Sequence, residues 1–157
     1  MPEAAAMKPL PAILTEPERR PKVLDDCIEV LDAEVDSKSG LTGIAIKGAY
    51  AVVKAVKPGF VRAAFSDMLE DFSARLDPFF QEARATSQPL PTFLASRAGK
   101  AADALLGITD ERATRAKNMS VKKAYDKLRP TAKKHVEAAI PRVSQMIEKN
   151  TADVADE

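Results

Sequence analysis

The sequence is poor in the residues from which disulfides and metal centres are built. Its 157 residues include one cysteine, Cys27, one histidine, His135, and no tryptophan. A single cysteine excludes an intramolecular disulfide and fits a reducing compartment. One cysteine and one histidine together cannot supply a Cys/His zinc site. We therefore predict a protein without metal or cofactor.

Long apolar runs are also missing. None approaches the roughly 18 residues that a membrane-spanning helix needs. Residues 1–7 lack the basic and apolar regions of a secretion signal, and Met7 is an alternative start. These features favour a soluble protein in the cytoplasm.

Neither sign of charge is in excess. The chain has 24 Lys and Arg residues against 23 Asp and Glu residues, a formal net charge of +1. The overall charge therefore indicates neither a nucleic-acid partner nor a membrane. The distribution is uneven, because residues 97–134 carry 11 basic and 4 acidic side chains, whereas the flanking segments are mildly acidic.

The sequence does contain enough aliphatic and small residues for one helical core. Hydrophobic residues make up 45% of the chain and aromatic residues 5%, so the core must be built from Ala, Val, Leu, Ile and six Phe. A chain of this length suits one domain. We predict an all-α protein: a single compact domain of seven or eight short helices over residues 10–150, between a flexible tail (residues 1–9) and an acidic tail (residues 151–157).

Apolar residues recur at spacings of three and four, which is the pattern of amphipathic helices. Leu24, Cys27, Leu31 and Val35 form one such stripe. In residues 41–57 a broad apolar arc carries little side-chain bulk, so neighbouring helices, or a second copy of this one, can approach closely. This arc consists of Leu41, Ile44, Ala45, Gly48, Val52, Ala55 and Val56.

Prolines and capping residues divide the pattern into separate helices. Thr15, followed three residues later by Glu18, matches a capping box and predicts a helix start. Asp77 and Pro78 predict that one helix ends and another begins there. Further breaks, restarts or kinks are expected at Gly107, Thr109, Ser120, Pro130 and Pro141.

Several segments resemble a family of small conserved bacterial proteins. The likeness lies in residues 39–50 (SGLTGIAIKGAY) and 57–61, together with Leu76-Asp77-Pro78-Phe79 and residues 124–129 (AYDKLR), and it extends from about Leu10 to Asn150. The members are helical proteins of unknown function. The resemblance therefore implies bacterial origin and an intracellular helical domain, and no activity.

One candidate site lies opposite the apolar arc of residues 41–57. Lys47, Tyr50, Lys54 and Lys57 form a strip that suits a phosphate, a nucleotide or a lipid head group, because lysines bind anions and tyrosine donates a hydrogen bond. The alternative is an ordinary solvated helix face. We favour the solvated face because no glycine-rich phosphate loop accompanies the strip.

A second candidate is the basic block. Two short helices around Asn118 would resemble a helix-turn-helix that places lysines on nucleic acid. The usual turn glycine is missing and acidic residues interrupt the block, so a charged helix surface is favoured. The candidate nucleic-acid-binding residues are Arg112, Arg115, Lys122, Lys123, Lys127 and Arg129.

Other reactive residue types have ordinary interpretations. Cys27 shares a face with leucines and is predicted to be a small core residue rather than a nucleophile. His135, beside two lysines, is expected to be a neutral surface histidine. Acidic pairs such as Asp25/Asp26 are interpreted as solvated faces. Tyr125 lies on an apolar face and is expected in the core.

These observations predict no catalytic residues and favour a non-enzymatic interaction or regulatory module, whose partner is another protein or a second copy. The first alternative binds a lipid or another anionic small ligand, through the lysine strip or in a cavity of the small-residue core. The second alternative binds nucleic acid through residues 112–134. An enzyme without a short motif stays open.

Overall fold

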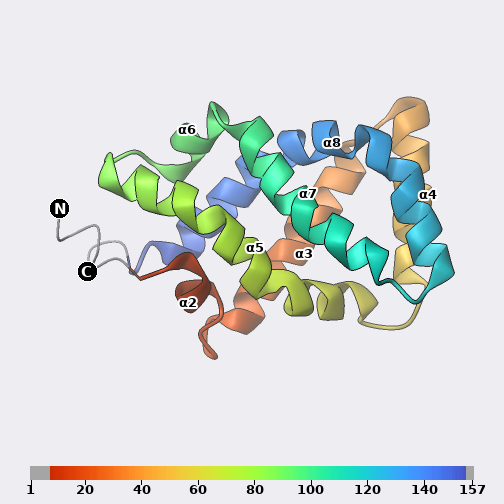
Figure 1. Cartoon of the computed structure of the whole chain (residues 1–157), viewed down its shortest axis with the longest axis horizontal. Helices are drawn as coiled ribbons and strands as arrows, with labels where there is room; N and C mark the ends of the chain where they lie inside the picture. The colour runs from red at the N-terminus through yellow and green to blue at the C-terminus, as the bar shows by residue number, and fades with distance from the viewer. Residues whose placement is uncertain (1–7, 155–157) are drawn as a thin grey trace.

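The computed structural model describes residues 8–154, and this part of the chain forms seven helices and no strand. In chain order these are α2 (Leu10–Leu14), α3 (Arg20–Ser37), α4 (Gly40–Lys54), α5 (Phe60–Ala85), α6 (Leu90–Ala95), α7 (Ala98–Thr114) and α8 (Met119–Thr151). They form a single compact domain (Figure 1). The all-helical prediction is confirmed, but α5 has 26 residues and α8 has 33, so the helices are not uniformly short.

The helix α8 organises the domain. Its first turns run beside α4, after which it changes direction and crosses the molecule past α3 and α6 towards α2 (Figure 1). Pro130 and Pro141 both lie inside it. A proline removes a backbone hydrogen bond and crowds the preceding turn, and sharp helix bends usually lie at such residues. We assign the change of direction to Pro130, which lies between the two limbs.

The best-packed part of the core lies where α2 and α6 pack on α5 and α8. Leu10, Ile13 and Phe93 are completely buried there, and Phe80 and Ile147 are 2% exposed. Both short helices begin with the same three residues, Pro-Leu-Pro, at residues 9–11 and 89–91. Neither has a capping side chain of its own.

Carboxylates from distant helices replace the missing caps. The backbone N–H of Leu10 donates to Asp77 Oδ1 on α5 at 2.8 Å, and the N–H of Leu90 donates to Glu148 Oε2 on α8 at 3.2 Å. Because both leucines are buried, water cannot serve these N–H groups. The two contacts fix the short helices to the long ones.

Asp77 therefore does not cap a helix of its own, and the predicted break at Asp77-Pro78 is wrong. The helix α5 continues through Pro78, which is exposed, as is Ala74 four residues earlier. The carbonyl that Pro78 leaves unpaired is on the solvent side, where water can serve it.

Four other predicted boundaries, at Thr15, Gly107, Thr109 and Ser120, are also wrong. The helix after Thr15 begins at Arg20, because Pro17 disfavours helical geometry at the preceding residue; the Thr15 hydroxyl instead donates to the Pro11 carbonyl. The helix α7 runs through Gly107, where a side chain would meet Arg75 of α5. Asn118, rather than Ser120, caps α8.

Two polar residues tie α3 to the end of α8. Asp26, predicted to face solvent, is 7% exposed and accepts a hydrogen bond from Asn150 Nδ2 at 2.8 Å. Burial raises the pKa of Asp26, but Lys22, Asn150 and Lys149 together outweigh burial and hold it below its ordinary value. Arg19 contacts both oxygens of Asp153 at 2.8 and 2.9 Å, so the predicted acidic tail makes an ordered contact at this residue.

We predict that Asp77→Ala lowers the free energy of unfolding by about 1–2 kcal/mol, because it leaves the buried Leu10 N–H without an acceptor. Asp77→Asn keeps an acceptor oxygen and should lose clearly less. Urea denaturation followed by circular dichroism measures both. Equal losses for the two variants would show that the cap does not matter.

Two glycines of α4 give a second prediction: replacing each by alanine should change the free energy of unfolding in opposite directions. A Cβ on Gly43 would lie 2.8 Å from the backbone of Lys38, whereas a Cβ on Gly48 would meet nothing within 4 Å. Gly48→Ala should therefore raise the free energy of unfolding by about 0.5–1 kcal/mol, and Gly43→Ala should lower it by about 1–3 kcal/mol. Thermal denaturation of the two variants tests this, and a shift of the same sign in both would contradict it.

Candidate functional site

Within the described part of the chain, an apolar cavity of about 400 Å³ lies between the long helices. Its wall combines α3, α5, α7 and both limbs of α8, with Ile46 from α4 and Leu14 from α2. The residues that line most of it are Cys27, Val30, Leu31, Phe65, Met68, Leu69, Phe72, Leu76, Leu105, Leu106, Leu128, Val136, Val143 and Met146.

Small side chains on α8 contribute to this space. Ala132 and Ala139 stand in the wall where a larger side chain would project inward. Several apolar residues of the wall, among them Phe65 and Met146, are only partly buried although they pack against the core. The chain therefore packs tightly at the α2/α6 end and leaves apolar space in the middle.

One part of the wall is polar. Glu34, only 8% exposed, accepts from Arg142 Nη1 at 2.5 Å and pairs with Lys38 Nζ at 3.4 Å. The Lys38 side chain is itself 16% exposed. Burial of such charges is costly unless they are paired, and here Glu34 is paired twice. The carboxylate thereby joins α3 to the second limb of α8.

His135 lies beside this cluster. The sequence predicted a surface histidine because lysines adjoin it in the chain, but the side chain is half-buried. It stands in the cavity wall, and its Nε2 is a buried atom without a hydrogen-bond partner among the described residues. Desolvation, with the positive charges of Lys38 and Lys134, lowers its pKa and outweighs the opposite influence of Glu34. The imidazole is therefore neutral near pH 7, as the sequence predicted.

Cys27 faces the same cavity from α3. It is partly buried and packs against the core, in agreement with the prediction of a small core residue. Burial, with a smaller contribution from Asp26, raises the pKa of the thiol to about 12. Because the thiolate is the nucleophile, the raised pKa makes Cys27 a poor nucleophile at neutral pH.

The predicted anion-binding strip lies on α4 and the turn that follows it, and none of its residues lines the cavity. Lys47, Lys54 and Lys57 are exposed, whereas Tyr50 is half-buried and donates a hydrogen bond to Asp32 of α3. The Lys54 ammonium lies 4.5 Å from the centre of the Tyr50 ring. Burial and the Asp32 carboxylate raise the pKa of Tyr50. The Tyr50 hydroxyl thus has a partner within the protein, and anion binding by the strip stays a prediction.

Most of the predicted nucleic-acid-binding cations have acidic partners. Ion pairs join Arg112 to Asp71, Arg115 to Glu111, Lys122 to Asp126 and Arg129 to Asp110. Among the described residues, Lys123 and Lys127 form no ion pair, and both are exposed. Phosphate contacts require cations that are free to replace counterions, so the pairing weakens this prediction without testing it.

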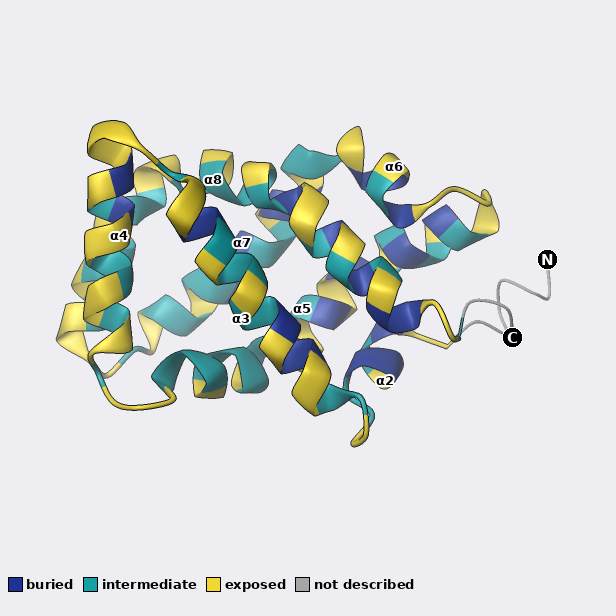
Figure 2. Ribbon diagram, turned by 180° about the vertical axis from the view of Figure 1, so that it is seen from behind, coloured by how far each residue is buried: buried dark blue, intermediate teal, exposed yellow. Residues whose placement is uncertain are grey.

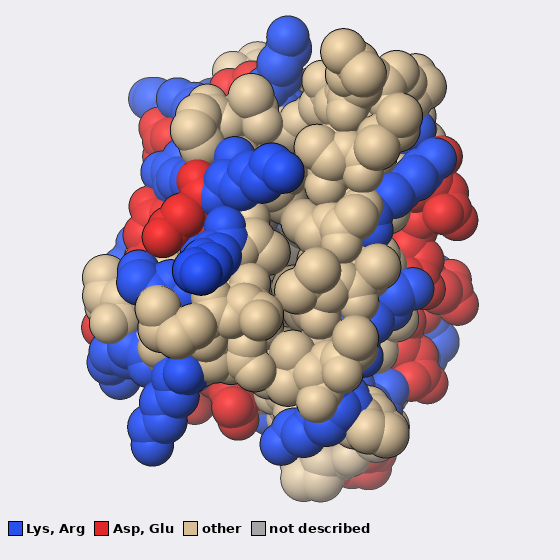
Figure 3. All heavy atoms as spheres, turned by 90° about the vertical axis from the view of Figure 1, so that its right-hand side faces the viewer, with Lys and Arg blue, Asp and Glu red and all other residues tan. Residues whose placement is uncertain are grey.

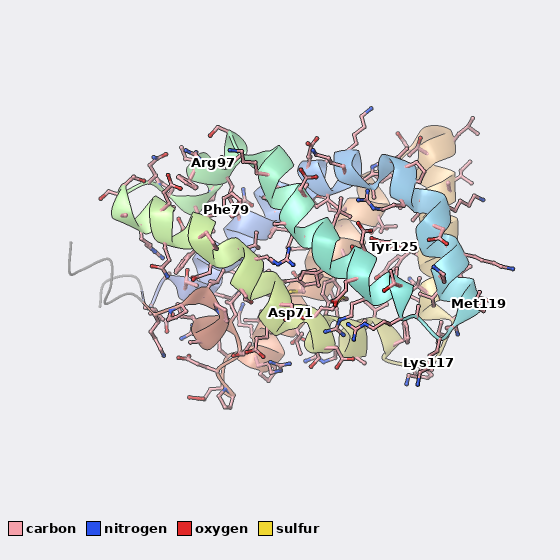
Figure 4. All side chains as sticks on the ribbon, viewed as in Figure 1. Asp71, Phe79, Arg97, Lys117, Met119 and Tyr125 are labelled. Atoms are coloured by element: carbon pink, nitrogen blue, oxygen red, sulfur yellow. The ribbon has the colours of Figure 1, made fainter. Side chains whose placement is uncertain are left out.

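Tyr125 has a structural role between α7 and α8. Figure 4 labels its side chain; its hydroxyl donates to Asp110, which also accepts two hydrogen bonds from Arg129, at 2.8 and 2.9 Å. Burial and Asp110 raise the pKa of Tyr125 to about 12. The residue is half-buried, with its polar end bonded, which is consistent with packing rather than base stacking.

The polar part of the cavity wall was missed by the sequence analysis. A signal was present: Glu34 and Lys38 follow Leu31 by three and seven residues and so continue its apolar stripe. Charged residues in a core-facing register indicate a buried polar cluster. Arg142 and His135 carry no such signal, because their place beside Glu34 depends on how α8 crosses α3.

The described residues include no group of three or more His, Cys, Asp and Glu side chains that could hold a metal ion. In the same part of the chain, every helix is too short or too polar to cross a membrane.

The lowered pKa of His135 predicts a pH dependence of stability. Since the folded pKa lies below the ordinary 6.5, the unfolded chain binds more protons between these two values. The free energy of unfolding should therefore fall as pH drops below 6.5, and His135→Phe should remove this slope. Asp26 and Asp110, whose pKa values are lowered, act only in more acidic solution.

The pKa can be read directly by proton NMR, because the chain has one histidine and hence one pair of imidazole signals. A value at or above 6.5, or an unchanged slope in His135→Phe, would show that the imidazole is not held neutral by this environment.

Comparison with known proteins gives one match. No curated protein and no solved structure matches the chain. The model of a family of unknown function matches residues 10–151, which are nearly all of the described residues. The chain therefore belongs to this family of unknown function (DUF6918).

Proposed function

We propose that the protein binds a long-chain apolar ligand, such as a fatty acid, in the central cavity. The observation that carries the proposal is the cavity itself, with about 400 Å³ and an almost wholly apolar lining. Ligand sites are typically concave, apolar and about 300–1,000 Å³ in volume, with a few polar groups that orient the ligand. The sequence favoured an interaction module over ligand binding, and the cavity is our reason for reversing that order.

Packing energetics support an apolar occupant. Protein interiors are close-packed, and side chains beside unfilled space lose dispersion contacts with no gain elsewhere. The wall consists of flexible or rounded side chains such as Leu31, Met68 and Met146, which adapt to an alkyl chain better than to a rigid polar molecule.

The polar part of the wall supports a ligand with one polar end. His135 Nε2 is a buried atom in need of a partner, and Lys38 lies close enough to lower the pKa of the imidazole. A hydroxyl or carboxyl head group would satisfy the imidazole, and a carboxylate would also gain from the ammonium. A simple hydrocarbon would leave this cluster unused.

The proposal is binding rather than catalysis. Cys27 is the only thiol and its pKa is raised, and His135 has no carboxylate or nucleophile bonded to it among the described residues. Nucleic-acid binding is second to this proposal, because four of its six cations are paired with acids.

A pair of alanine substitutions on adjacent positions of α8 tests the proposal. Ala139 lines the cavity and Ala138 is exposed. We predict that the protein binds a fluorescent long-chain fatty acid, that Ala139→Phe weakens this binding roughly tenfold or more by filling the space, and that Ala138→Phe does not change it. Fluorescence titration gives the dissociation constants, and urea denaturation shows that both variants fold.

Cys27 reports where the fatty acid binds. With the raised pKa, an excess of an apolar maleimide should modify this thiol slowly, and saturation with fatty acid should slow the modification further, because the thiol lines the cavity. The proposal fails if the folded protein binds no fatty acid, or if Ala139→Phe binds as well as the parent and Cys27 is not protected.

A further inference from the structure

The helix α4 is apolar on two opposite sides. Its inner side, with Gly43 and Ile46, is buried against the domain. Its outer side exposes Leu41 at 87%, Ile44 at 69% and Val52 at 42% (Figure 2). These residues belong to the arc that the sequence analysis identified, and most of the arc faces solvent rather than the core. A helix that is apolar nearly all round is normally covered on both sides.

Met119, 59% exposed, extends this surface at the start of α8, with Lys117 nearby (Figure 4). These four side chains are the large hydrophobic residues that the described chain leaves exposed. Gly48 and Ala51, both exposed, lie between Ile44 and Val52. Gly48 has no side chain and that of Ala51 is a single methyl group, so neither projects beyond the aliphatic residues on either side. We name the surface made by Leu41, Ile44, Val52 and Met119 the α4 face.

Basic residues border the α4 face on two sides. Figure 3 looks onto this end of the molecule and shows an uncharged ridge with Lys and Arg side chains along its edges, and acidic residues farther out. Lys47, Lys54 and Lys57 come from α4 and its end, and Lys117 and Lys123 come from the start of α8 and the preceding loop. All five are exposed, and none forms an ion pair within the described residues.

Ion pairs are more frequent among the other cations of the described residues. Arg19, Arg62, Arg112, Arg129 and Arg142 all contact carboxylates. Twelve of the nineteen Lys and Arg residues outside the α4 face lie within 4 Å of a carboxylate of the described chain, whereas none of the five lysines around it does. An apolar strip between such lysines complements a partner that offers apolar groups beneath a layer of negative charge.

We propose that the α4 face docks the protein onto the surface of a bilayer that contains anionic lipids. An amphipathic helix of this kind lies in the interface plane with its apolar side among the acyl chains. The lysine stems cover apolar surface while their ammonium groups reach the phosphates. This occupant accounts for both the exposed aliphatic residues and the charge around them.

A second copy of the chain fits the same surface less well. Lysines lie along both edges, so two α4 faces in contact would bring lysines against lysines at either edge, and like charges oppose such a pair. The proposal is also independent of ligand binding, because it depends on the outside of α4 and the cavity depends on the inside of the bundle.

Sedimentation of the full chain with lipid vesicles tests the proposal. We expect binding to vesicles of phosphatidylcholine mixed with phosphatidylglycerol, little binding to phosphatidylcholine alone, and weaker binding at high salt. The variant Lys47→Gln/Lys54→Gln/Lys57→Gln should bind about a hundredfold more weakly, since each lysine near an anionic surface contributes about fivefold. Leu41→Ser/Ile44→Ser should also lose binding, and it removes only exposed side chains.

The matched control is Lys8→Gln/Lys100→Gln/Lys133→Gln, which removes the same charge from positions outside the α4 face and should retain most of the binding. The proposal is overturned if the parent binds no anionic vesicles, if it binds neutral vesicles equally well, or if the control loses as much as the α4 variant. It is also overturned in favour of a second copy if Leu41→Ser/Ile44→Ser converts a dimer to a monomer while vesicles are not bound.

The cavity variant separates this proposal from ligand binding. Ala139→Phe should sediment with anionic vesicles as the parent does, and Lys47→Gln/Lys54→Gln/Lys57→Gln should bind free fatty acid as the parent does. Loss of vesicle binding in Ala139→Phe would show instead that the protein reaches the bilayer through its cavity ligand, and would overturn docking by the α4 face.

Discussion

The change of direction within α8 is the constraint on which the rest of the structure depends. A straight helix of 33 residues would be nearly 50 Å long and would contact neighbours along one line. With Pro130 between its limbs, the first limb covers α4 and α7, and the second limb packs on α3 and α6. The cavity lies inside this angle, because residues of both limbs, from Leu128 to Ile147, contribute to its wall.

Packing differs between the α2/α6 end and the middle of the molecule, and single residues account for the difference. At the α2/α6 end, Phe80 and Phe93 fill the interior and two distant carboxylates hold the short helices in place. In the middle, Ala132 and Ala139 leave space that no aromatic residue fills. In this region the buried Glu34 pairs with Lys38 and with Arg142. The Arg142 contact joins α3 to α8 and holds the two helices at a fixed separation.

The inner and outer sides of α4 face two different environments. Ile46 contributes to the cavity wall, while Ile44, two residues earlier, is largely exposed. If both proposals hold, a single helix separates the acyl-binding space from the lipid surface, and the source of the ligand lies next to its site. The physical basis is that a helix with aliphatic residues on two opposite sides buries one side against its own small domain and leaves the other exposed.

The sequence by itself determined the helical class, an aliphatic core with few aromatic residues, and the chemical character of Cys27 and His135. Periodicity and composition are local properties, and they are retained in the folded chain. The continuation of α5 through Asp77 was decided by tertiary structure: Asp77 has the side chain of a helix cap, but its partner is Leu10, 67 residues away. The same holds for α4, whose apolar arc was evident in the sequence although no local pattern could show which of its apolar sides the domain covers. Only the path of α8 placed His135 and Arg142 beside Glu34, because the register of two helices depends on the packing of the whole chain.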